Sequence, residues 1–263
     1  MARILSESNS SEEAEIARIV AAYRERDAIG PSHEYSWTNP TFAAYRHQLE
    51  SEVLRALRDG GVELARASVL DVGCGSGYML HRFAEYGAPE LHGIDLMDAR
   101  VGEAHRRYPT LQVRQGSATA LPYGDESFDL VTQFTCLSSV LDAQVRARIA
   151  TEMWRVLRPG GAVLSFDLRP PSLPLRALVA RNRWRARRPA RARTGASTPV
   201  QPLPATELER LFPEVRIVSR SLILHPALAA LTRGRPLPSQ LLATLPPLRS
   251  HLIAVIHKPA KQG

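Results

Sequence analysis

A glycine-rich turn between a buried strand and a helix constrains the fold of this chain more than any other feature. The segment reads VLDVGCGSGYML over residues 69–80 and carries glycine at positions 73, 75 and 77. Glycine permits a tight turn and lets a ligand lie against bare backbone. A dinucleotide-binding turn would need GxGxxG, with glycine in place of Tyr78, and the GxxxxGKS/T pattern of a P-loop does not occur. The turn therefore predicts a ligand site of a different kind.

Short apolar runs alternate with helical stretches from residue 67 onward, and this order predicts an α/β fold. Strands are predicted at Val69–Val72, Leu91–Ile94, Leu111–Val113, Phe128–Gln133, Ala162–Phe166, Val215–Ile223 and His251–His257. Helices are predicted at Met79–Tyr86, Arg100–Tyr108, Asp142–Leu157 and Ala205–Phe212, the last capped by Thr206. The first connections must be right-handed crossovers, so a parallel sheet covered on both faces is expected.

Two aspartates accompany the glycine turn. Asp71 precedes it on the first strand, and Asp95 ends the next strand, 22 residues after Gly73. In a doubly wound sheet both lie at the carboxyl edge, where ligands bind. A carboxylate at Asp95 suits the hydroxyl groups of a ribose, while the charge of Asp71 disfavours a phosphate. The pair favours a ligand with a ribose, an amine and a positive centre.

At this point the chain resembles the class I S-adenosylmethionine-dependent methyltransferases over about 100 residues, Val69 to Asp167. Five segments in order carry the resemblance: VLDVGCGSG, GIDL, GSATALPY at 116–123, SFDLV at 127–131 and LRPGG at 157–161, the last as a turn before the fifth strand. The resemblance implies a Rossmann-like doubly wound sheet, mostly parallel with a C-terminal antiparallel strand. It also implies S-adenosylmethionine as the methyl donor and S-adenosylhomocysteine as the product.

The resemblance also implies roles for individual residues around the donor. The glycines of the turn would contact its methionine and ribose parts, Asp71 would hold its amino end, and Asp95 would bind the ribose hydroxyls. The family usually has Asp at the position of Ser117, so the adenine contact here passes through an uncharged hydroxyl. The cofactor-binding set is Asp71, Gly73, Gly75, Gly77, Asp95, Leu96, Met97, Ser117, Ala118 and Gln133.

The acceptor side is less well specified by the sequence. If a hydroxyl must be deprotonated, His33 and Asp167 are the candidate bases, although a loop hydrogen bond or a pair with Arg169 explains them equally well. Alignment of the acceptor with the activated methyl group can also supply much of the rate without a base. Candidate substrate contacts are Tyr35, Trp37, Phe134 and Ser138.

Two further patterns bear on the acceptor. Cys136 lacks the Pro-Cys context of cytosine methylation, so we do not predict a catalytic thiol. The D/N-P-P-Y/F motif of enzymes that methylate exocyclic amines of nucleic acids is missing too. Two cysteines without a CxxC or a Cys/His cluster predict no metal site and no disulfide framework.

The charge of the chain is concentrated in one segment. The formal net charge is +8, but nine arginines and no acidic residue lie between Arg169 and Arg193, so the remainder carries −1. This Arg/Pro-rich insertion, 169–204, could be a solvated flap, a contact with an anionic membrane, or a nucleic-acid contact. We favour the flap, since one basic cluster with a single aromatic residue, Trp184, and no known module is weak support for nucleic-acid binding.

Residues 1–60 are predicted to form an N-terminal helical lid, and residues 61–263 the methyltransferase domain with its insertion. A polar tail leads into a first helix around Ile16–Tyr23, and a second helix covers Phe42–Leu57. No basic-then-apolar leader and no run of about 18 apolar residues is seen, so a cytoplasmic location is expected.

We therefore expect methyl transfer to an O, N or C nucleophile of a small molecule, with specialised metabolism as one candidate setting and with nucleic acid unfavoured as a partner. Two alternatives stay open: a methyltransferase acting on RNA or on a membrane-associated lipid or glycan through the basic segment, and a non-catalytic protein that binds the cofactor. The sequence does not define the oligomeric state.

Overall fold

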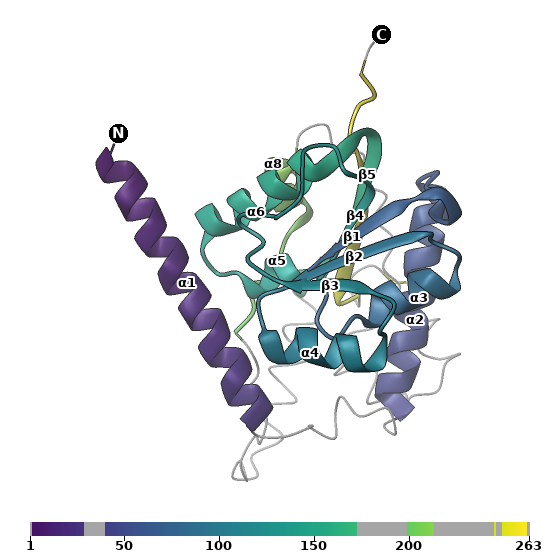
Figure 1. Ribbon diagram of the computed structural model, residues 1–263, viewed down its shortest axis with the longest axis horizontal. Coiled ribbons are helices and arrows are strands. Elements are labelled where there is room, and N and C mark those ends of the chain that lie inside the picture. The colour runs from purple at the N-terminus through teal and green to yellow at the C-terminus, as the bar shows by residue number, and fades with distance from the viewer. Residues whose placement is uncertain (1, 29–39, 173–198, 213–244, 246–248, 262–263) are drawn as a thin grey trace.

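The computed structural model describes residues 2–28, 40–172, 199–212, 245 and 249–261 (Figure 1). The helices are α1 (Ala2–Ala28), α2 (Pro40–Asp59), the 3-10 turn η2 (Leu64–Arg66), α3 (Tyr78–Glu85), α4 (Asp98–Arg107), α5 (Cys136–Ser139), α6 (Ala143–Val156) and α8 (Ala205–Leu211). The strands are β1 (Ser68–Val72), β2 (Glu90–Asp95), β3 (Gln112–Gln115), β4 (Phe128–Phe134), β5 (Leu157–Leu168) and β6 (His251–His257). The strand predicted at 215–223 lies outside the described residues.

These six strands form one sheet in the order β3-β2-β1-β4-β5-β6. The neighbouring pairs among β1 to β5 are parallel, and β6 runs antiparallel to β5. The predicted fold class, a doubly wound and mostly parallel sheet with a C-terminal antiparallel strand, is confirmed. The strand order reverses between β1 and β4, and a crevice at the carboxyl ends of such a pair is where ligands of this fold bind.

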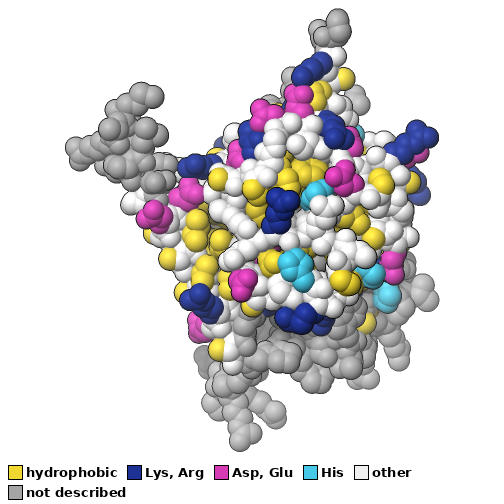
Figure 2. Space-filling view, in the orientation of Figure 1, with side chains coloured by type: hydrophobic (Ala, Val, Ile, Leu, Met, Phe, Trp, Pro, Cys, Tyr) yellow, Lys and Arg dark blue, Asp and Glu magenta, His cyan; other side chains and the backbone are white. Residues whose placement is uncertain are grey.

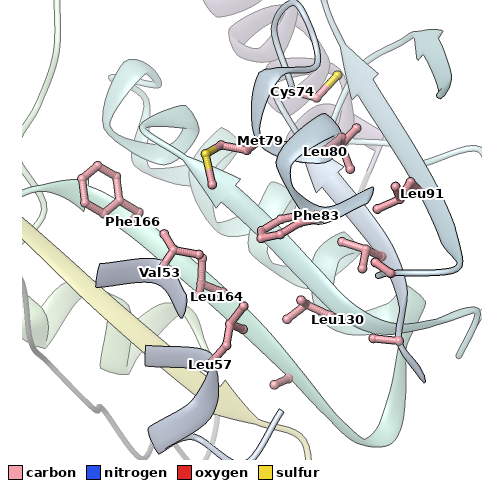
Figure 3. Close-up of a cluster of buried hydrophobic side chains, with 14 of the residues drawn as sticks. Val53, Leu57, Cys74, Met79, Leu80, Phe83, Leu91, Leu130, Leu164 and Phe166 are labelled. Carbon is pink, nitrogen blue, oxygen red and sulfur yellow. The ribbon is translucent and has the colours of Figure 1, made fainter. Parts of the chain in front are cut away.

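Both faces of the sheet are covered, because alternate side chains of each strand enter one of two cores. One core joins the sheet to α2, α3 and α4, with Val53, Leu80 and Phe83 packed around Leu130 and Leu164 (Figure 3). The other joins the opposite face to α5, α6 and α8. Along β1 the alternation sends Val69 to the first core and Leu70 to the second, so Asp71 points to the same face as Val69.

Helix α1 lies along the side of the domain next to α6 (Figure 1), and it is held largely by polar contacts. Glu15 accepts a hydrogen bond from the backbone N–H of Leu141 at 2.5 Å, and Arg18 donates to the carbonyl of Ser139 at 2.7 Å. Ile19 packs against the second core. The expected polar tail is therefore wrong: the helix begins at Ala2.

Two other local predictions differ from the structure, and one short helix was missed. The turn expected at 157–161 is part of β5, where the backbone N–H of Gly160 donates to the carbonyl of Lys258 beyond β6. Thr206 does not cap α8, whose N-cap is Pro204. The four-residue helix α5 was not predicted, since a single turn shows no apolar periodicity.

Candidate cofactor-binding site

The glycine turn connects β1 to α3 at the carboxyl edge of the sheet. Gly73, Gly75 and Gly77 all have positive φ angles, +73°, +55° and +78°, which side chains rarely tolerate. The backbone N–H groups of Gly73 and Cys74 donate to the carbonyl of Ile94 at 2.8 and 3.0 Å. The turn is thus fixed against the end of β2, the strand that carries Asp95.

The three glycines differ in what surrounds them. A Cβ at Gly73 would come within 2.9 Å of the Cys136 Sγ, and one at Gly77 within 3.2 Å of Leu111. A Cβ at Gly75 would meet no atom within 4 Å among the described residues. Gly73 and Gly77 are therefore needed for packing as well as for backbone angle. At Gly75 the turn instead borders open space that a ligand can fill.

Asp95 contacts the backbone of Gly75. Its carboxylate accepts hydrogen bonds from the backbone N–H of Gly75 at 2.8 Å and of Met97 at 2.9 Å. The same residue's carbonyl accepts from the N–H of Gly116 at 3.0 Å. The structure therefore brings the glycine turn, Asp95 to Met97 and the start of the 116–118 loop together, as a common cofactor site requires.

Asp71 lies below the turn and is only 2% exposed. Its register partner on β4, Thr132, donates a hydroxyl hydrogen bond to its carboxylate at 2.8 Å. Burial raises the pKa of Asp71 to about 7; the Thr132 hydrogen bond opposes this rise, and the charge of Asp95 adds to it. A cationic amine placed nearby would favour the ionised form, which agrees with the role expected for Asp71.

Ser117, the candidate adenine contact, belongs to a polar chain that reaches the N-terminal helix. Its hydroxyl lies 2.7 Å from that of Thr119, and the Thr119 hydroxyl donates to the carboxylate of Glu12 on α1. Arg148 of α6 pairs with Glu12 at 2.8 Å and also donates to the carbonyl of Thr119 at 3.2 Å. Ala118 packs against the second core. Nothing in the local sequence singles out Glu12, which is 107 residues from Thr119.

Gln133 and Asp167 form a buried network beneath α5. The Gln133 amide donates to the Asp167 carboxylate at 2.6 Å and accepts from the N–H of Cys136 at 2.9 Å. The other Asp167 oxygen accepts from the N–H of Ser138 at 3.1 Å. Burial raises the pKa of Asp167 to about 6 despite these hydrogen bonds.

All three side chains of this network, those of Gln133, Asp167 and Ser138, are fully buried in the structure. The geometry favours a positioning role for Asp167, which holds the first turn of α5. Its use as a base, the cofactor contact of Gln133 and the substrate contact of Ser138 stay predictions. His33, Tyr35 and Trp37 lie outside the described residues, and so does most of the basic insertion.

A row of aromatic rings lines the carboxyl edge beside this network. Phe134 lies 6.2 Å from Phe166, whose ring stacks on His251 at 4.6 Å between centroids, and Tyr45 of α2 lies 5.7 Å from His251. Phe134 is only partly buried. His251 was not singled out in the sequence. Its place follows from topology, because an antiparallel final strand begins at the carboxyl edge.

Neither cysteine has the surroundings of a nucleophile. Burial raises the pKa of the Cys136 thiol strongly, and the nearby carboxylates of Asp167, Asp95 and Asp71 add to the effect. Cys74 is shifted in the same direction, again mainly by burial. Because the thiolate is the reactive form, both sites disfavour thiol catalysis.

Charges on the described surface are mixed. On the face in Figure 2, basic and acidic side chains are interspersed, so no extended field of one sign is seen there. None of the helices in the described part of the chain is long and apolar enough to cross a membrane.

Comparison with known proteins agrees with this geometry. The family described as "Methyltransferase domain" matches residues 69–161. A probable S-adenosylmethionine-dependent methyltransferase of Mycolicibacterium smegmatis is 37% identical over 100 residues, which are 38% of this chain and 37% of that protein. A demethylmenaquinone methyltransferase of Lactiplantibacillus plantarum is 30% identical over 158 residues, 57% of this chain and 63% of the relative. The chain thus spans less than two thirds of the length of these curated relatives.

Solved structures share the fold at low sequence identity. The PH0226 protein of Pyrococcus horikoshii superposes with a TM-score of 0.57 at 16% identity, over 86% of this chain and 95% of that one. The matched family covers the glycine turn, Asp95, Ser117 and β4, which are the parts that the structure assembles into one site. Residues 69–161 of this chain are therefore a methyltransferase domain of the class I, S-adenosylmethionine-dependent family.

Proposed function

We propose that this protein transfers a methyl group from S-adenosylmethionine to an O, N or C nucleophile of a small molecule. The observation that carries the proposal is the contact between Gly75 and Asp95. A glycine with open space at its Cβ position is held at 2.8 Å to a carboxylate, at the point where the strand order reverses. Bare backbone beside a carboxylate suits a ribose, and Asp71 beneath it suits a cationic amine.

The residues present fit this donor. Asp95 would hold the ribose hydroxyls, Met97 would pack against the adenine, and the Ser117 hydroxyl would accept a hydrogen bond from its amine. When bound, the donor supplies a methyl group on a positively charged sulfur, which needs little further activation. The protein must then mainly align the acceptor and exclude water, and alignment can supply a large part of the rate.

The acceptor would approach over α5 and the ends of β4 and β5. The ring of Phe134 is partly exposed there and is backed by the buried rings of Phe166 and His251, so Phe134 offers a firm apolar contact for a small molecule. The demethylmenaquinone methyltransferases among the relatives are consistent with an acceptor of that kind. If the acceptor must lose a proton, His33 remains the candidate base.

Calorimetric titration with S-adenosylhomocysteine tests the cofactor site. We expect wild type to bind and Asp95→Ala to lose at least about tenfold in affinity, because charge-assisted hydrogen bonds to the ribose are removed. Asp125→Ala is the matched control: Asp125 is exposed and precedes β4, at the opposite edge of the sheet. No binding by wild type, or equal losses in both variants, would refute the proposed site.

A second assay separates enzyme from binding protein. Labelled methyl groups are offered with a panel of quinones, phenols and amines and with the fractions of a cell extract, including its RNA. Wild type should give labelled product, and Asp95→Ala should give little. Tight binding of S-adenosylhomocysteine without transfer to any of these acceptors would instead favour the non-catalytic alternative. Transfer into the RNA fraction would refute a small-molecule acceptor.

A further inference from the structure

We propose that Glu12 of the N-terminal helix fixes the direction of the hydrogen bond that Ser117 offers to the bound base, and so selects a base that presents an amine there. This inference rests on the proposed function, since it places the adenine of the donor at Ser117. It makes α1 a specificity-determining part of the cofactor site.

The chain of contacts runs from α1 to the 116–119 loop. The Thr119 side chain is buried, and its hydroxyl is bonded both to Glu12 and, at 2.7 Å, to the Ser117 hydroxyl. The backbone N–H of Thr119 also donates to the Ser117 hydroxyl at 3.3 Å. Glu12 is held in place by Arg148, whose guanidinium lies 2.8 Å from the second carboxylate oxygen.

The proton positions along this chain follow from what each group can do. An ionised carboxylate only accepts hydrogen bonds, so Thr119 must donate its single hydroxyl proton to Glu12. The Thr119 oxygen can then only accept, and the Ser117 hydroxyl must donate to it. Ser117 has no proton left for a ligand. Its oxygen, which already accepts from the Thr119 N–H, can offer a ligand only its remaining lone pair.

A lone pair at this position discriminates between bases. The exocyclic amine of adenine donates a hydrogen bond and would be accepted. Hypoxanthine has a carbonyl oxygen at the same place, so two acceptors would face each other. A buried polar group that cannot pair costs at least about tenfold in affinity. The carboxylate that the family usually places on the loop itself would here act from α1, through two hydroxyl groups.

Substitution of Glu12 by Gln should reverse the chain. Arg148 only donates, so it would draw the oxygen of the new amide toward itself. The amide NH2 group would then face Thr119 and donate to it. Thr119 would in turn donate to Ser117, whose own proton would become available to the ligand. Glu12→Gln would therefore convert Ser117 from an acceptor into a donor with almost no change in shape.

The experiment compares two ligands on the full chain of each variant by calorimetry: S-adenosylhomocysteine and S-inosylhomocysteine. The second ligand has a carbonyl oxygen in place of this amine and a proton on the neighbouring N1. We expect wild type to prefer the adenosyl compound by about tenfold or more, and Glu12→Gln to reduce that preference by about tenfold. Glu13→Gln is the matched control, because Glu13 is exposed on the same helix and the substitution removes the same charge. It should keep the wild-type preference.

The change in this ratio between variants isolates Ser117, because the difference at N1 and the other contacts to the base are the same in every variant. An unchanged ratio in Glu12→Gln, with folding verified by circular dichroism, would overturn the inference. If that variant does not fold, Thr119→Val interrupts the same chain and should also reduce the ratio; an unchanged ratio there would be equally fatal. Failure of wild type to bind either compound would instead refute the proposed function.

Discussion

Replacing Gly75 by alanine should separate the stability of the glycine turn from its binding function. The backbone at Gly75 has a φ of +55°, where a side chain costs about 1–2 kcal/mol. Alanine also restricts the unfolded chain, which returns about 0.4–1 kcal/mol. No described atom lies within 4 Å of the new methyl group, so no clash adds to this. The net loss of stability should be about 0.5–1 kcal/mol, or about 1–4 °C in Tm.

Binding should suffer far more than stability at Gly75. The methyl group would enter the open space at Gly75 that the donor is proposed to fill, next to the backbone N–H that Asp95 accepts from. Overpacking of a fitted site costs about 1–3 kcal/mol, which corresponds to about 5- to 150-fold in affinity. Calorimetry with S-adenosylhomocysteine measures this loss.

The matched variant is Gly73→Ala, in which protein atoms already occupy the space that the new methyl group needs. Its φ is +73°, but its methyl group would also come within 2.9 Å of the Cys136 Sγ. Strain and overpacking together should cost about 2–4 kcal/mol, or about 5–15 °C in Tm. Thermal unfolding by circular dichroism compares the two. The reasoning is refuted if Gly75→Ala binds S-adenosylhomocysteine as wild type does, or if it loses as much stability as Gly73→Ala.

Two further predictions concern buried charges. Because the pKa of Asp71 is raised from 3.8 to about 7, the folded protein keeps a proton there that the unfolded chain has lost, and stability falls as pH rises across that window. Asp71→Asn should therefore have a free energy of unfolding up to about 4 kcal/mol above that of wild type at pH 8, since each pKa unit corresponds to about 1.4 kcal/mol. At pH 4 the difference should be small. A difference in urea unfolding that does not depend on pH would contradict this prediction. The buried Arg146 pairs with Glu207 at 2.6 Å and donates to the carbonyls of Val140 and Leu141. Arg146→Met should lower the free energy of unfolding in urea by about 3 kcal/mol. Arg66→Met, which removes a pair with Glu63 that is exposed on both sides, should lower it by less than about 1 kcal/mol; equal losses would refute the role of burial.

The sheet and the cofactor half of the site could be predicted because their information is local. Parallel strands buried on both faces appear as short, nearly continuous apolar runs, and these were recognisable. The glycine turn and Asp95 lie within 25 residues of each other and at the ends of adjacent strands. Chain order and strand direction are then enough to place them at one edge.

Element boundaries that depend on distant partners could not be predicted in this way. Pro159, Gly160 and Gly161 have the composition of a turn, yet they continue β5, because the carbonyl of Gly161 accepts from the N–H of Lys258 almost 100 residues later. Helix α1 likewise extends beyond its apolar spacing. Its polar residues are held by the end of α5 and the segment that follows it, over 120 residues away.

In the acceptor half of the proposed site, Thr135 is the clearest case of a local conformation that distant partners determine and that the sequence does not predict. This β-branched residue has a φ of +59°, an angle at which sequence reasoning expects glycine. The angle is held by three contacts: its N–H donates to the carbonyl of Phe166 at 2.7 Å, and the hydroxyls of Ser138 and Ser139 donate to its own carbonyl. The bend turns the chain from β4 into α5 and directs the next backbone N–H groups toward Gln133 and Asp167.

A strained residue that several contacts hold in place is typical of a functional site. Here the strain explains why Asp167 is buried. The sequence places its carboxylate at the ligand edge, where a base would lie, and this position is right. The bend at Thr135 then brings α5 across the edge, so that the carboxylate accepts from the Ser138 N–H and the Gln133 amide. In the proposed reaction Asp167 would thus support the surface on which an acceptor rests, and alignment above that surface would supply much of the rate.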